Sequence, residues 1–472
     1  MIILDFISHI LFVLALGYYL ITNLQWYSYK MERVIFHHTK VWWHLVYFLL
    51  PFGLYLFANS FGYIIVFLYL FFLFQWYQTL DKQLVFTGRI KRFFIILLFL
   101  ALFEDILCVV LSSCGNFGVF IPLVISLIVS FSLEAILFEG FKKNAKKRLE
   151  THQYMTIVGI TASYGKTSIK NFIYHILKEN FKTYATPRSV NTLGGVMKDV
   201  NDDLPTDTEV YIVEMGARGR GDISEITLFV NPHYAIVGKV GVAHLEYFGS
   251  LENIRDTKME IMQSKRLKEG WVHNSAYINP SDTIHQFGDE VTDVKSTLDG
   301  LSFKLDGVEY NTKLLGSFNT INLVASIKIA LALGMKPEDI QKRVSTIEPV
   351  PHRLQRIDAG GKVILDHSFN GNIDGMMASF ELASSYSGRK VLITPGLVEV
   401  DDMFNEEVAK KANEVFDLVV ITGDLNYHIF KELIDQNKLI KLQSKDKMQE
   451  MLVENTEIGD LILFANDAPS FI

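Results

Sequence analysis

The stretch GITASYGKTS, residues 159–168, combines residue types that bind a nucleoside triphosphate. Gly165 lets the backbone approach phosphate closely, the Lys166 ammonium neutralises the β- and γ-phosphates, and the Thr167 hydroxyl is a ligand for Mg2+. An apolar, β-rich run precedes the stretch at 154–160, and apolar side chains at helical spacing follow it. Backbone N–H groups and the helix dipole attract anions at the start of such a helix. The pattern therefore predicts a phosphate loop between a strand and a helix.

The spacing within this loop is unusual. Five residues, rather than four, separate Gly159 from Gly165, and Ala162 stands where a third glycine could be expected. Because alanine tolerates fewer backbone conformations than glycine, we expect Ala162 to lie in an ordinary backbone region. Ser168, directly after Thr167, completes the set of residues that we expect to bind the nucleotide.

A carboxylate follows a second apolar strand. The segment EVYIVEMGARGRGDI, residues 209–223, places Glu214 at the end of that strand. From there a carboxylate can reach Mg2+ beside the triphosphate. An exposed acid at a strand end is the alternative interpretation of Glu214.

The composition limits the classes of protein to which the chain can belong. Its 472 residues are enough for about two to four domains. Acidic residues outnumber basic ones after residue 150, so no basic surplus points to nucleic acid as a partner. Cys108 and Cys114 are the two cysteines, which excludes a disulfide framework and a four-cysteine zinc site. The first apolar stretch lacks a basic leader and a small-residue cleavage site, so we expect no cleavable signal peptide.

Five apolar stretches in the first 141 residues are long enough to span a membrane, or nearly so. They cover about 6–24, 42–58, 61–79, 93–111 and 117–138. The loops alternate between basic and uncharged, so the positive-inside rule puts the N-terminus outside and everything after residue 141 in the cytoplasm. The sequence thus predicts a multi-pass protein of the inner (cytoplasmic) membrane that contacts lipid. Buried core helices are the alternative.

Acidic side chains within these stretches leave a transport role open. Glu104, Asp105 and Glu134 fall inside the apolar stretches, where acids often serve a function. They could equally lie near a span end or pair between helices, and the sequence identifies no transported species.

Four segments downstream of the phosphate loop occur in an order known from one enzyme family. They are AHLEYFGSLENIRDTKMEI (243–261), GSFNTIN (316–322), VPHRLQ (350–355) and LDHSFNGNIDGM (365–376). With the loop and NTLGG at 191–195, they make residues 154–400 resemble the Mur ligases. These enzymes use ATP to join an amino acid or peptide to a carboxylate of a peptidoglycan precursor.

The resemblance implies an α/β fold in two domains. A central ATP-binding domain with a phosphate loop and a mostly parallel sheet is expected at 154–346, and a Rossmann-like α/β C-terminal domain at 347–472. An α-helical membrane domain of about five spans then occupies 1–141, followed by a basic linker at 142–153. The soluble domain by which Mur ligases usually grip uridine diphosphate is not recognised, and the apolar stretches occupy its place.

The resemblance also assigns metal ligands. His244 would bind a second Mg2+, and Lys258 falls where the family carries a carbamylated lysine. A bare ammonium beside two Mg2+ ions would be repelled, whereas a carbamate offers an anionic, bidentate oxygen ligand. Together with Thr167 and Glu214, these residues form the expected metal site.

Nucleotide contacts are implied in the same way. Asn319 and Asn322 would contact the nucleotide, Arg353 would reach the ATP phosphates, and Asp366 would hold the ribose. Besides Ala162, several positions depart from the family pattern: Phe318 replaces a histidine, His352 a glycine, Phe369 a tyrosine and Ile373 a proline. The expected catalytic residues are Lys166, His244, Lys258 and Arg353.

The segments HLEYFGS and VEMGA resemble most closely one branch of the family. Its members add D-alanyl-D-alanine to UDP-N-acetylmuramoyl-tripeptide through an acyl phosphate. The partners implied are these two small molecules and membrane-bound peptidoglycan enzymes. A Mur-like ligase of another pathway, acting in polyglutamate synthesis or on a lipid-linked precursor, is the alternative. An inactive membrane scaffold and a transporter with an attached ATPase remain open as well.

Overall fold

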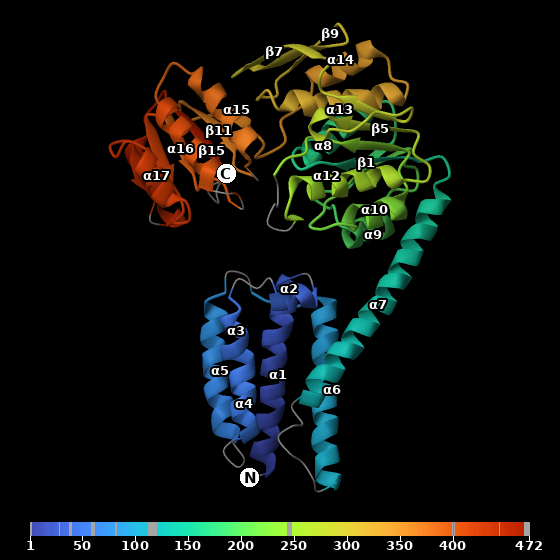
Figure 1. The fold of residues 1–472 in the computed structure, drawn as a ribbon, viewed down its shortest axis with the longest axis vertical. Coiled ribbons are helices and arrows are strands. Elements are labelled where there is room, and N and C mark those ends of the chain that lie inside the picture. The colour runs from blue at the N-terminus through green and yellow to red at the C-terminus, as the bar shows by residue number, and fades with distance from the viewer. Residues whose placement is uncertain are drawn as a thin grey trace. The chain divides into compact units, whose positions relative to one another are not determined.

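The computed structural model divides the chain into two compact units, Met1–Lys142 and Lys143–Ile472 (Figure 1). The residues that it describes are 2–27, 29–36, 40–57, 62–80, 83–111, 120–242, 248–369, 371–398, 400, 402–442 and 444–466. The predicted site residue His244 lies outside these ranges.

The described part of the first unit is helical, as expected for long apolar runs without the alternation of strands. Its helices are α1 (Ile2–Trp26), α2 (Met31–Phe36), α3 (Trp42–His44), the π-helical η1 (Leu45–Leu49), α4 (Leu50–Phe57), α5 (Gly62–Gln78), α6 (Gly88–Leu111) and α7 (Phe120–Thr151). The basic segment that follows the last apolar stretch is helical as well, because α7 continues to Thr151.

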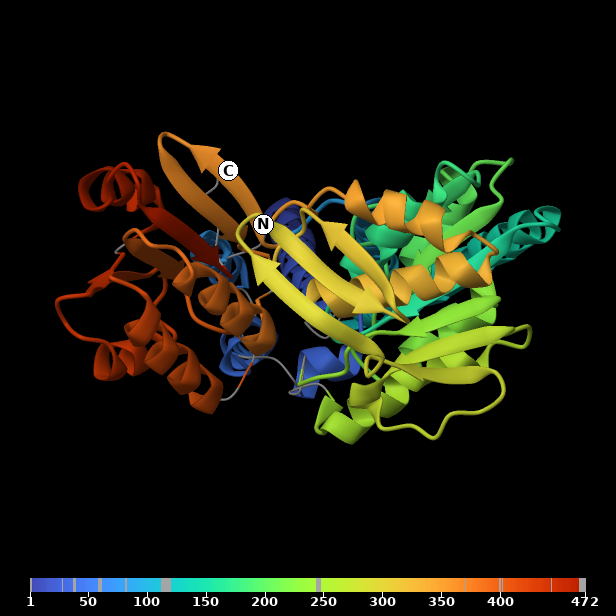
Figure 2. The same ribbon diagram turned by 90° about the horizontal axis from the view of Figure 1, so that it is seen from above.

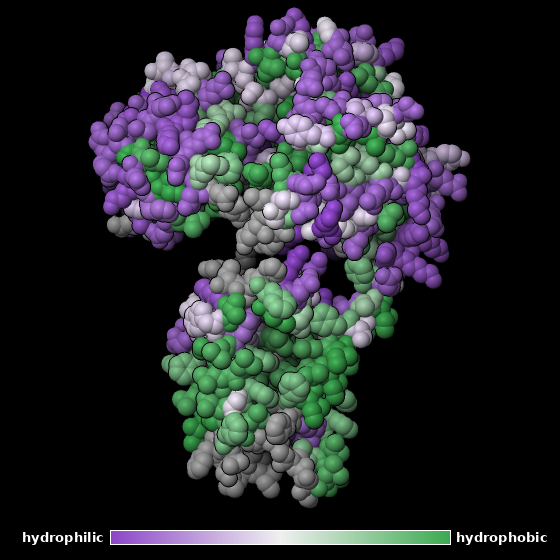
Figure 3. Space-filling model, viewed as in Figure 1, coloured by the Kyte–Doolittle hydropathy of each residue, from purple (hydrophilic) through white to green (hydrophobic). Residues whose placement is uncertain are grey.

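The core of the first unit is built around α1. Phe12, Leu16 and Tyr19 of α1 are buried there. Trp76 of α5 lies 5.0 Å from Tyr19 between ring centroids, and Leu97 of α6 belongs to the same cluster. Many outward side chains are apolar as well, and they give this unit its hydrophobic surface in Figure 3; examples are Phe67, Phe71, Ile95, Phe99 and Val110.

Among the residues that the structure describes, three helices are long and apolar enough to cross a membrane by length and composition: Phe6–Trp26, Gly88–Leu111 and Phe120–Thr151. Two shorter apolar helical segments, Trp42–Phe57 and Gly62–Gln78, coincide with the second and third predicted stretches. Helices therefore occur at all five predicted places, while five spans remain a prediction.

The second unit contains two sheets of mostly parallel strands, which confirms the expected α/β class (Figure 2). The central sheet has the order β2-β3-β1-β4-β5-β6, and its strand pairs are parallel. Its strands are β1 (Thr156–Thr161), β2 (Thr183–Ala185), β3 (Val210–Glu214), β4 (Tyr234–Val237), β5 (Glu269–His273) and β6 (Ile284–Phe287). The helices beside it are α8 (Lys166–Leu177), α9 (Leu193–Asp202), α10 (Asp222–Val230), α12 (Leu251–Met259), α13 (Asn319–Ala332) and α14 (Pro337–Ser345).

The C-terminal sheet has the order β10-β11-β15-β12-β13-β14, in which β10 alone pairs antiparallel. Its strands are β10 (Gln355–Ala359), β11 (Lys362–His367), β12 (Lys390–Thr394), β13 (Leu418–Ile421), β14 (Leu439–Lys441) and β15 (Leu461–Ala465). Helices α15 (Ile373–Ser384), α16 (Asp402–Val415), α17 (Tyr427–Leu433) and α18 (Met448–Asn455) accompany it. The small antiparallel sheet of β7 (Val291–Thr297), β8 (Gly300–Leu305) and β9 (Val308–Thr312) is not anticipated by the sequence analysis.

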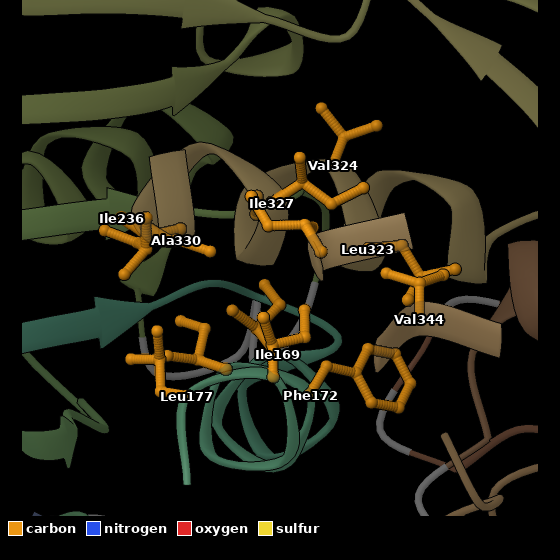
Figure 4. Close-up of a cluster of buried hydrophobic side chains, with 14 of the residues drawn as sticks. Ile169, Phe172, Leu177, Ile236, Leu323, Val324, Ile327, Ala330 and Val344 are labelled. Atoms are coloured by element: carbon orange, nitrogen blue, oxygen red, sulfur yellow. The ribbon is translucent and has the colours of Figure 1, made fainter. Parts of the chain in front are cut away.

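A buried apolar contact holds the start of α8 against α13 (Figure 4). Ile169 and Phe172 of α8 lie in one cluster with Leu323 and Ile327 of α13. Burial of each such side chain contributes about 1.5–3 kcal/mol. The contact therefore holds the segment before α8 beside the start of α13.

Candidate active site

The predicted loop connects β1 to α8, as expected, and its geometry requires glycine at one position. Gly165 precedes α8 with φ +82°. A Cβ at this position would lie 2.3 Å from Oδ1 of Asn322, so a side chain cannot be accommodated. Ala162 is absent from the described residues with positive φ, which agrees with the ordinary conformation expected of it. The loop therefore tolerates alanine at 162 and glycine alone at 165.

Lys166 is the first residue of α8, and its side chain folds back over the loop. Its Nζ donates to the carbonyl oxygens of Ala162 at 2.8 Å and Ser163 at 3.1 Å. Burial lowers the pKa of Lys166, Glu214 opposes this shift, and Arg353 adds to it. The ammonium is thus positioned at the loop, with a carboxylate and a guanidinium near enough to influence it. Thr167 and the buried Ser168 follow in the first turn of α8.

Glu214 ends β3 and is 1% exposed, so the interpretation as an exposed acid is wrong. Its Oε1 accepts from Nδ2 of Asn191 at 3.2 Å. Its Oε2 lies 3.1 Å from Nζ of Lys170 and accepts no hydrogen bond within the described part of the chain. Lys170 is a site residue that the sequence analysis missed. Its signal is a lysine within an otherwise apolar helical face, four residues after Lys166.

Lys258 lies in α12 and is 4% exposed. Burial, with a contribution from Lys166, lowers the pKa of its ammonium to about 7, while Asp222 and Glu260 oppose the shift. A substantial fraction of the side chain is therefore an uncharged amine at neutral pH, which is the form that reacts with carbon dioxide. No cluster of three or more His, Cys, Asp or Glu side chains that could hold a metal is found among the described residues, which do not include His244.

The two predicted asparagines lie at the start of α13, beside the loop. Nδ2 of Asn319 donates to the carbonyl oxygen of Leu315 at 2.7 Å, and Nδ2 of Asn322 donates to Oδ1 of Asn319 at 3.1 Å. Since Asn322 also lies against Gly165, the pair holds the loop in position from one side.

Arg353 and Asp366 come from the part of the chain that forms the C-terminal sheet. The Arg353 guanidinium stacks on Phe369, 4.6 Å from the ring centroid. Burial lowers the pKa of Arg353, and Glu214 opposes this shift. Asp366 is 1% exposed and accepts hydrogen bonds from Nδ1 of His352 at 2.7 Å and from Oγ of Ser368 at 2.6 Å.

Phe318, which stands where the family pattern has a histidine, packs against His367. Its ring lies 5.6 Å from that of His367 between centroids. Burial lowers the pKa of His367 to about 4, with Arg353 adding to the shift and Asp366 opposing it. His367 is therefore a neutral imidazole, and its buried Nδ1 accepts or donates no hydrogen bond within the described residues.

An ion pair connects a residue that follows a strand of the central sheet to a helix that packs on the C-terminal sheet. Nζ of Lys239, which follows β4, lies 2.9 Å from Oδ2 of Asp374 in the first turn of α15. Lys166 is thus under the electrostatic influence of Glu214 and Arg353, Lys258 is under that of Lys166, and both Arg353 and Asp366 influence His367. Cations that surround a phosphate loop and a buried carboxylate can neutralise a triphosphate and an approaching carboxylate.

Comparison with known proteins identifies the central region. Residues 160–330 match the family model of the Mur ligase middle domain. UDP-N-acetylmuramoyl-tripeptide–D-alanyl-D-alanine ligase of Bacillus subtilis is 27% identical over 334 residues, which are 65% of this chain and 72% of that protein. The Synechocystis enzyme of the same name is 30% identical over 252 residues, or 52% of this chain and 55% of that protein.

The fold agrees with these matches. The structure of MurF ligase from Thermotoga maritima in complex with ADP superposes with a TM-score of 0.60 at 24% identity, covering 70% of this chain and 80% of that one. The match in sequence covers 72% of the Bacillus subtilis protein but 55% of the Synechocystis protein. Residues 160–330 of this chain are thus similar in sequence to the Mur ligase middle domain, and the fold is similar to that of a Mur ligase.

Proposed function

We propose that the chain is an ATP-dependent ligase that adds D-alanyl-D-alanine to UDP-N-acetylmuramoyl-tripeptide. The relatives carry this activity in their names. The observation that carries the proposal is the gathering of Lys166, Arg353 and the buried Glu214 at the phosphate loop. Amide formation from a carboxylate and ATP needs this combination, because both reactants are anions that repel each other.

The reaction proceeds in two steps. The carboxylate of the tripeptide attacks the γ-phosphorus of ATP, the bond to the β,γ-bridging oxygen breaks, and ADP and an acyl phosphate form. The amine of D-alanyl-D-alanine then attacks the acyl carbon, loses a proton, and phosphate leaves. Lys166 and Arg353 neutralise the charge on the transferred phosphoryl group, and Asn322 keeps the loop in the conformation that binds the phosphates of ATP.

The residues fit a bound Mg2+. Oε2 of Glu214 is buried without a hydrogen bond, and the Thr167 hydroxyl lies in the first turn after the loop. These two groups would hold the ion, with phosphate oxygens and water completing its coordination. When bound, Mg2+ polarises phosphate oxygens as a Lewis acid. His244 is proposed for a second ion on the family resemblance.

Lys258 is proposed to be carbamylated. It is buried, its amine is partly uncharged at neutral pH, and its neighbour Lys166 disfavours a second positive charge. Carbamylation replaces the cation by an anion and removes this repulsion. The product would offer two oxygens to metal at the same position.

We further propose that the first unit lies in the inner (cytoplasmic) membrane, with the N-terminus outside and the ligase unit in the cytoplasm. The apolar outward side chains and the three helices of spanning length support this placement. Membrane-bound enzymes that consume the product are the proposed partners.

The test uses the full chain, purified in detergent, with ATP, UDP-N-acetylmuramoyl-tripeptide and D-alanyl-D-alanine. ADP release that requires both peptide substrates supports the proposal. The apolar unit favours one alternative, a lipid-linked acceptor, and ADP release with that acceptor alone would transfer the assignment to it. No ADP release with either acceptor would contradict both.

A further inference from the structure

Lys170 is a buried cation for which the reaction described above provides no role. It lies one turn after Lys166 on α8 and is 2% exposed. Its ammonium forms an ion pair with Oε2 of Glu214 at 3.1 Å and donates to the carbonyl oxygen of Arg188. A buried ammonium is stable only when it is paired and hydrogen-bonded. The buried ammonium of Lys170 therefore depends on both partners, and one of them, Glu214, is the carboxylate that is proposed to bind Mg2+.

The other partner belongs to the segment 186–191, which connects β2 to α9. This segment is bound to the end of β3 at both of its ends. Oγ1 of Thr186 accepts from the backbone N–H of Glu214 at 3.2 Å, and Nδ2 of Asn191 donates to Oε1 of the same residue at 3.2 Å. The N–H of Gly216 donates to the carbonyl oxygen of Asn191 at 2.7 Å. Lys170 holds the middle of the segment, and Glu214 takes part in the contacts with Thr186, Asn191 and Lys170.

The backbone of this segment is strained at the point that Lys170 holds. Arg188 has φ +48°, a conformation that costs a residue with a Cβ about 1–2 kcal/mol. Such strain persists only when surrounding contacts impose it. The Lys170 ammonium, bound to the Arg188 carbonyl oxygen, is a contact of this kind.

We propose that Lys170 is a positioning residue that couples the segment 186–191 to the cation site at Glu214. The segment ends at Asn191, the first residue of NTLGG, and we place NTLGG at the acceptor because it resembles the acceptor-facing segment of the Mur ligases, so the inference rests on the proposed function. A divalent cation at Oε2 of Glu214 and the Lys170 ammonium compete for one oxygen atom. Binding of the cation therefore alters the contact that imposes the conformation of Arg188, and the acceptor site responds.

The coupling predicts that loss of the Lys170 ammonium strengthens the binding of a divalent cation and weakens the binding of the acceptor. In Lys170→Met the carboxylate loses its resident cation, so Mn2+, used as the probe, binds several-fold more tightly. The segment loses its anchor, so the KM for the acceptor rises about tenfold, as expected for the loss of a hydrogen bond to a charged group. A merely structural role would weaken both affinities or neither.

The experiment measures Mn2+ binding by electron paramagnetic resonance and hydrogen exchange of the segment 186–191, on the full chain. In the wild type, Mn2+ should change exchange of the segment; in Lys170→Met exchange should be fast and insensitive to Mn2+. Lys178→Met removes an exposed lysine from the end of the same helix and should behave as wild type. Weaker Mn2+ binding in Lys170→Met, or exchange that still responds to Mn2+, would overturn the proposal.

A second variant covers the case in which Lys170→Met does not fold. Arg188 is exposed, and Arg188→Gly relaxes the strained backbone while it leaves Lys170 and Glu214 in place. Because glycine adopts positive φ without strain, the segment no longer needs the Lys170 contact to keep its conformation. Exchange of the segment should therefore respond less to Mn2+ than in the wild type while Mn2+ affinity stays unchanged; a response equal to that of the wild type would contradict the inference. Failure of the wild type to turn over UDP-N-acetylmuramoyl-tripeptide would instead remove the proposed function, and the exchange measurement would still test the coupling.

Discussion

Nδ1 of His352 lies 2.7 Å from Oδ2 of Asp366, at a position where related sequences are expected to carry glycine. His352 has φ +63°, in the region that glycine occupies without strain. The chain therefore accepts an unfavourable backbone conformation and gains a hydrogen bond to a carboxylate that is 1% exposed. Because Asp366 is the proposed ribose ligand, this pair orients the carboxylate before the nucleotide binds.

Replacement of His352 separates the effect of the backbone strain from the effect of the hydrogen bond to Asp366. Glycine recovers about 1 kcal/mol of backbone strain and loses a hydrogen bond of about the same size, so the melting temperature should change little. The KM for ATP should rise several-fold with kcat unchanged, because Asp366 loses the hydrogen bond that orients its Oδ2 and keeps those from Ser368 to Oδ1. Asparagine tolerates positive φ and can donate to Asp366, so His352→Asn should retain most of the ATP affinity. Steady-state kinetics and thermal unfolding check this; identical KM values for all three proteins would contradict it.

Lys166→Ala should lower ADP formation by at least about 100-fold, since the ammonium compensates charge that develops on the transferred phosphoryl group. Its hydrogen bonds reach backbone oxygens of the loop alone, so the fold should survive. Turnover is measured by ADP release, and integrity by thermal unfolding in detergent. A folded variant with wild-type turnover would disprove the assignment of the phosphate loop.

Gly165→Ala should abolish nucleotide binding, because the added methyl group would lie 2.3 Å from Oδ1 of Asn322 and the backbone has φ +82°. Truncation of Asn322 in the same protein should restore binding only in part, since a backbone strain of about 1–2 kcal/mol remains. Gly219→Ala is the matched control, because a Cβ there meets no atom within 4 Å. Binding of a fluorescent ATP analogue distinguishes the three variants; equal affinities would show that the loop rearranges freely.

Local sequence is sufficient to predict the loop between β1 and α8, because its glycine, lysine and flanking periodicity lie within about twenty residues of one another. Phosphate binding by this loop stays a prediction. Glu214 is also predictable in position, as the end of an apolar strand. Its burial and its pairing with Lys170 are not, since they arise when α8, β3 and the segment 186–191 meet in the fold. Positive φ at Arg188 and His352 likewise depends on tertiary contacts rather than on local preference.

The antiparallel sheet β7-β8-β9 was missed for a different reason. Most side chains of β7 are at least partly exposed, so its apolar residues do not alternate clearly with polar ones. The α/β character of the C-terminal part was predicted from the family resemblance, and its strands β12, β13 and β15 are short, largely buried apolar runs, as is typical of parallel sheets. Neither the sequence nor the described residues place His244, so its role stays a prediction.

Activity should depend on dissolved bicarbonate if Lys258 is carbamylated. Burial lowers the pKa of this amine to about 7, and the uncharged amine is the reactive form, so carbamylation is suppressed below pH 7 and favoured above it. Removal of carbon dioxide should therefore reduce turnover, with a larger reduction at pH 6 than at pH 8, and added bicarbonate should restore it. Lys258→Ala should be inactive and insensitive to bicarbonate, and the short carboxylic acids that can enter the vacated space should rescue part of its activity. A Lys258→Ala protein with the wild-type rate would exclude the carbamate, whereas an inactive one that no carboxylic acid rescues would leave the lysine acting as an amine.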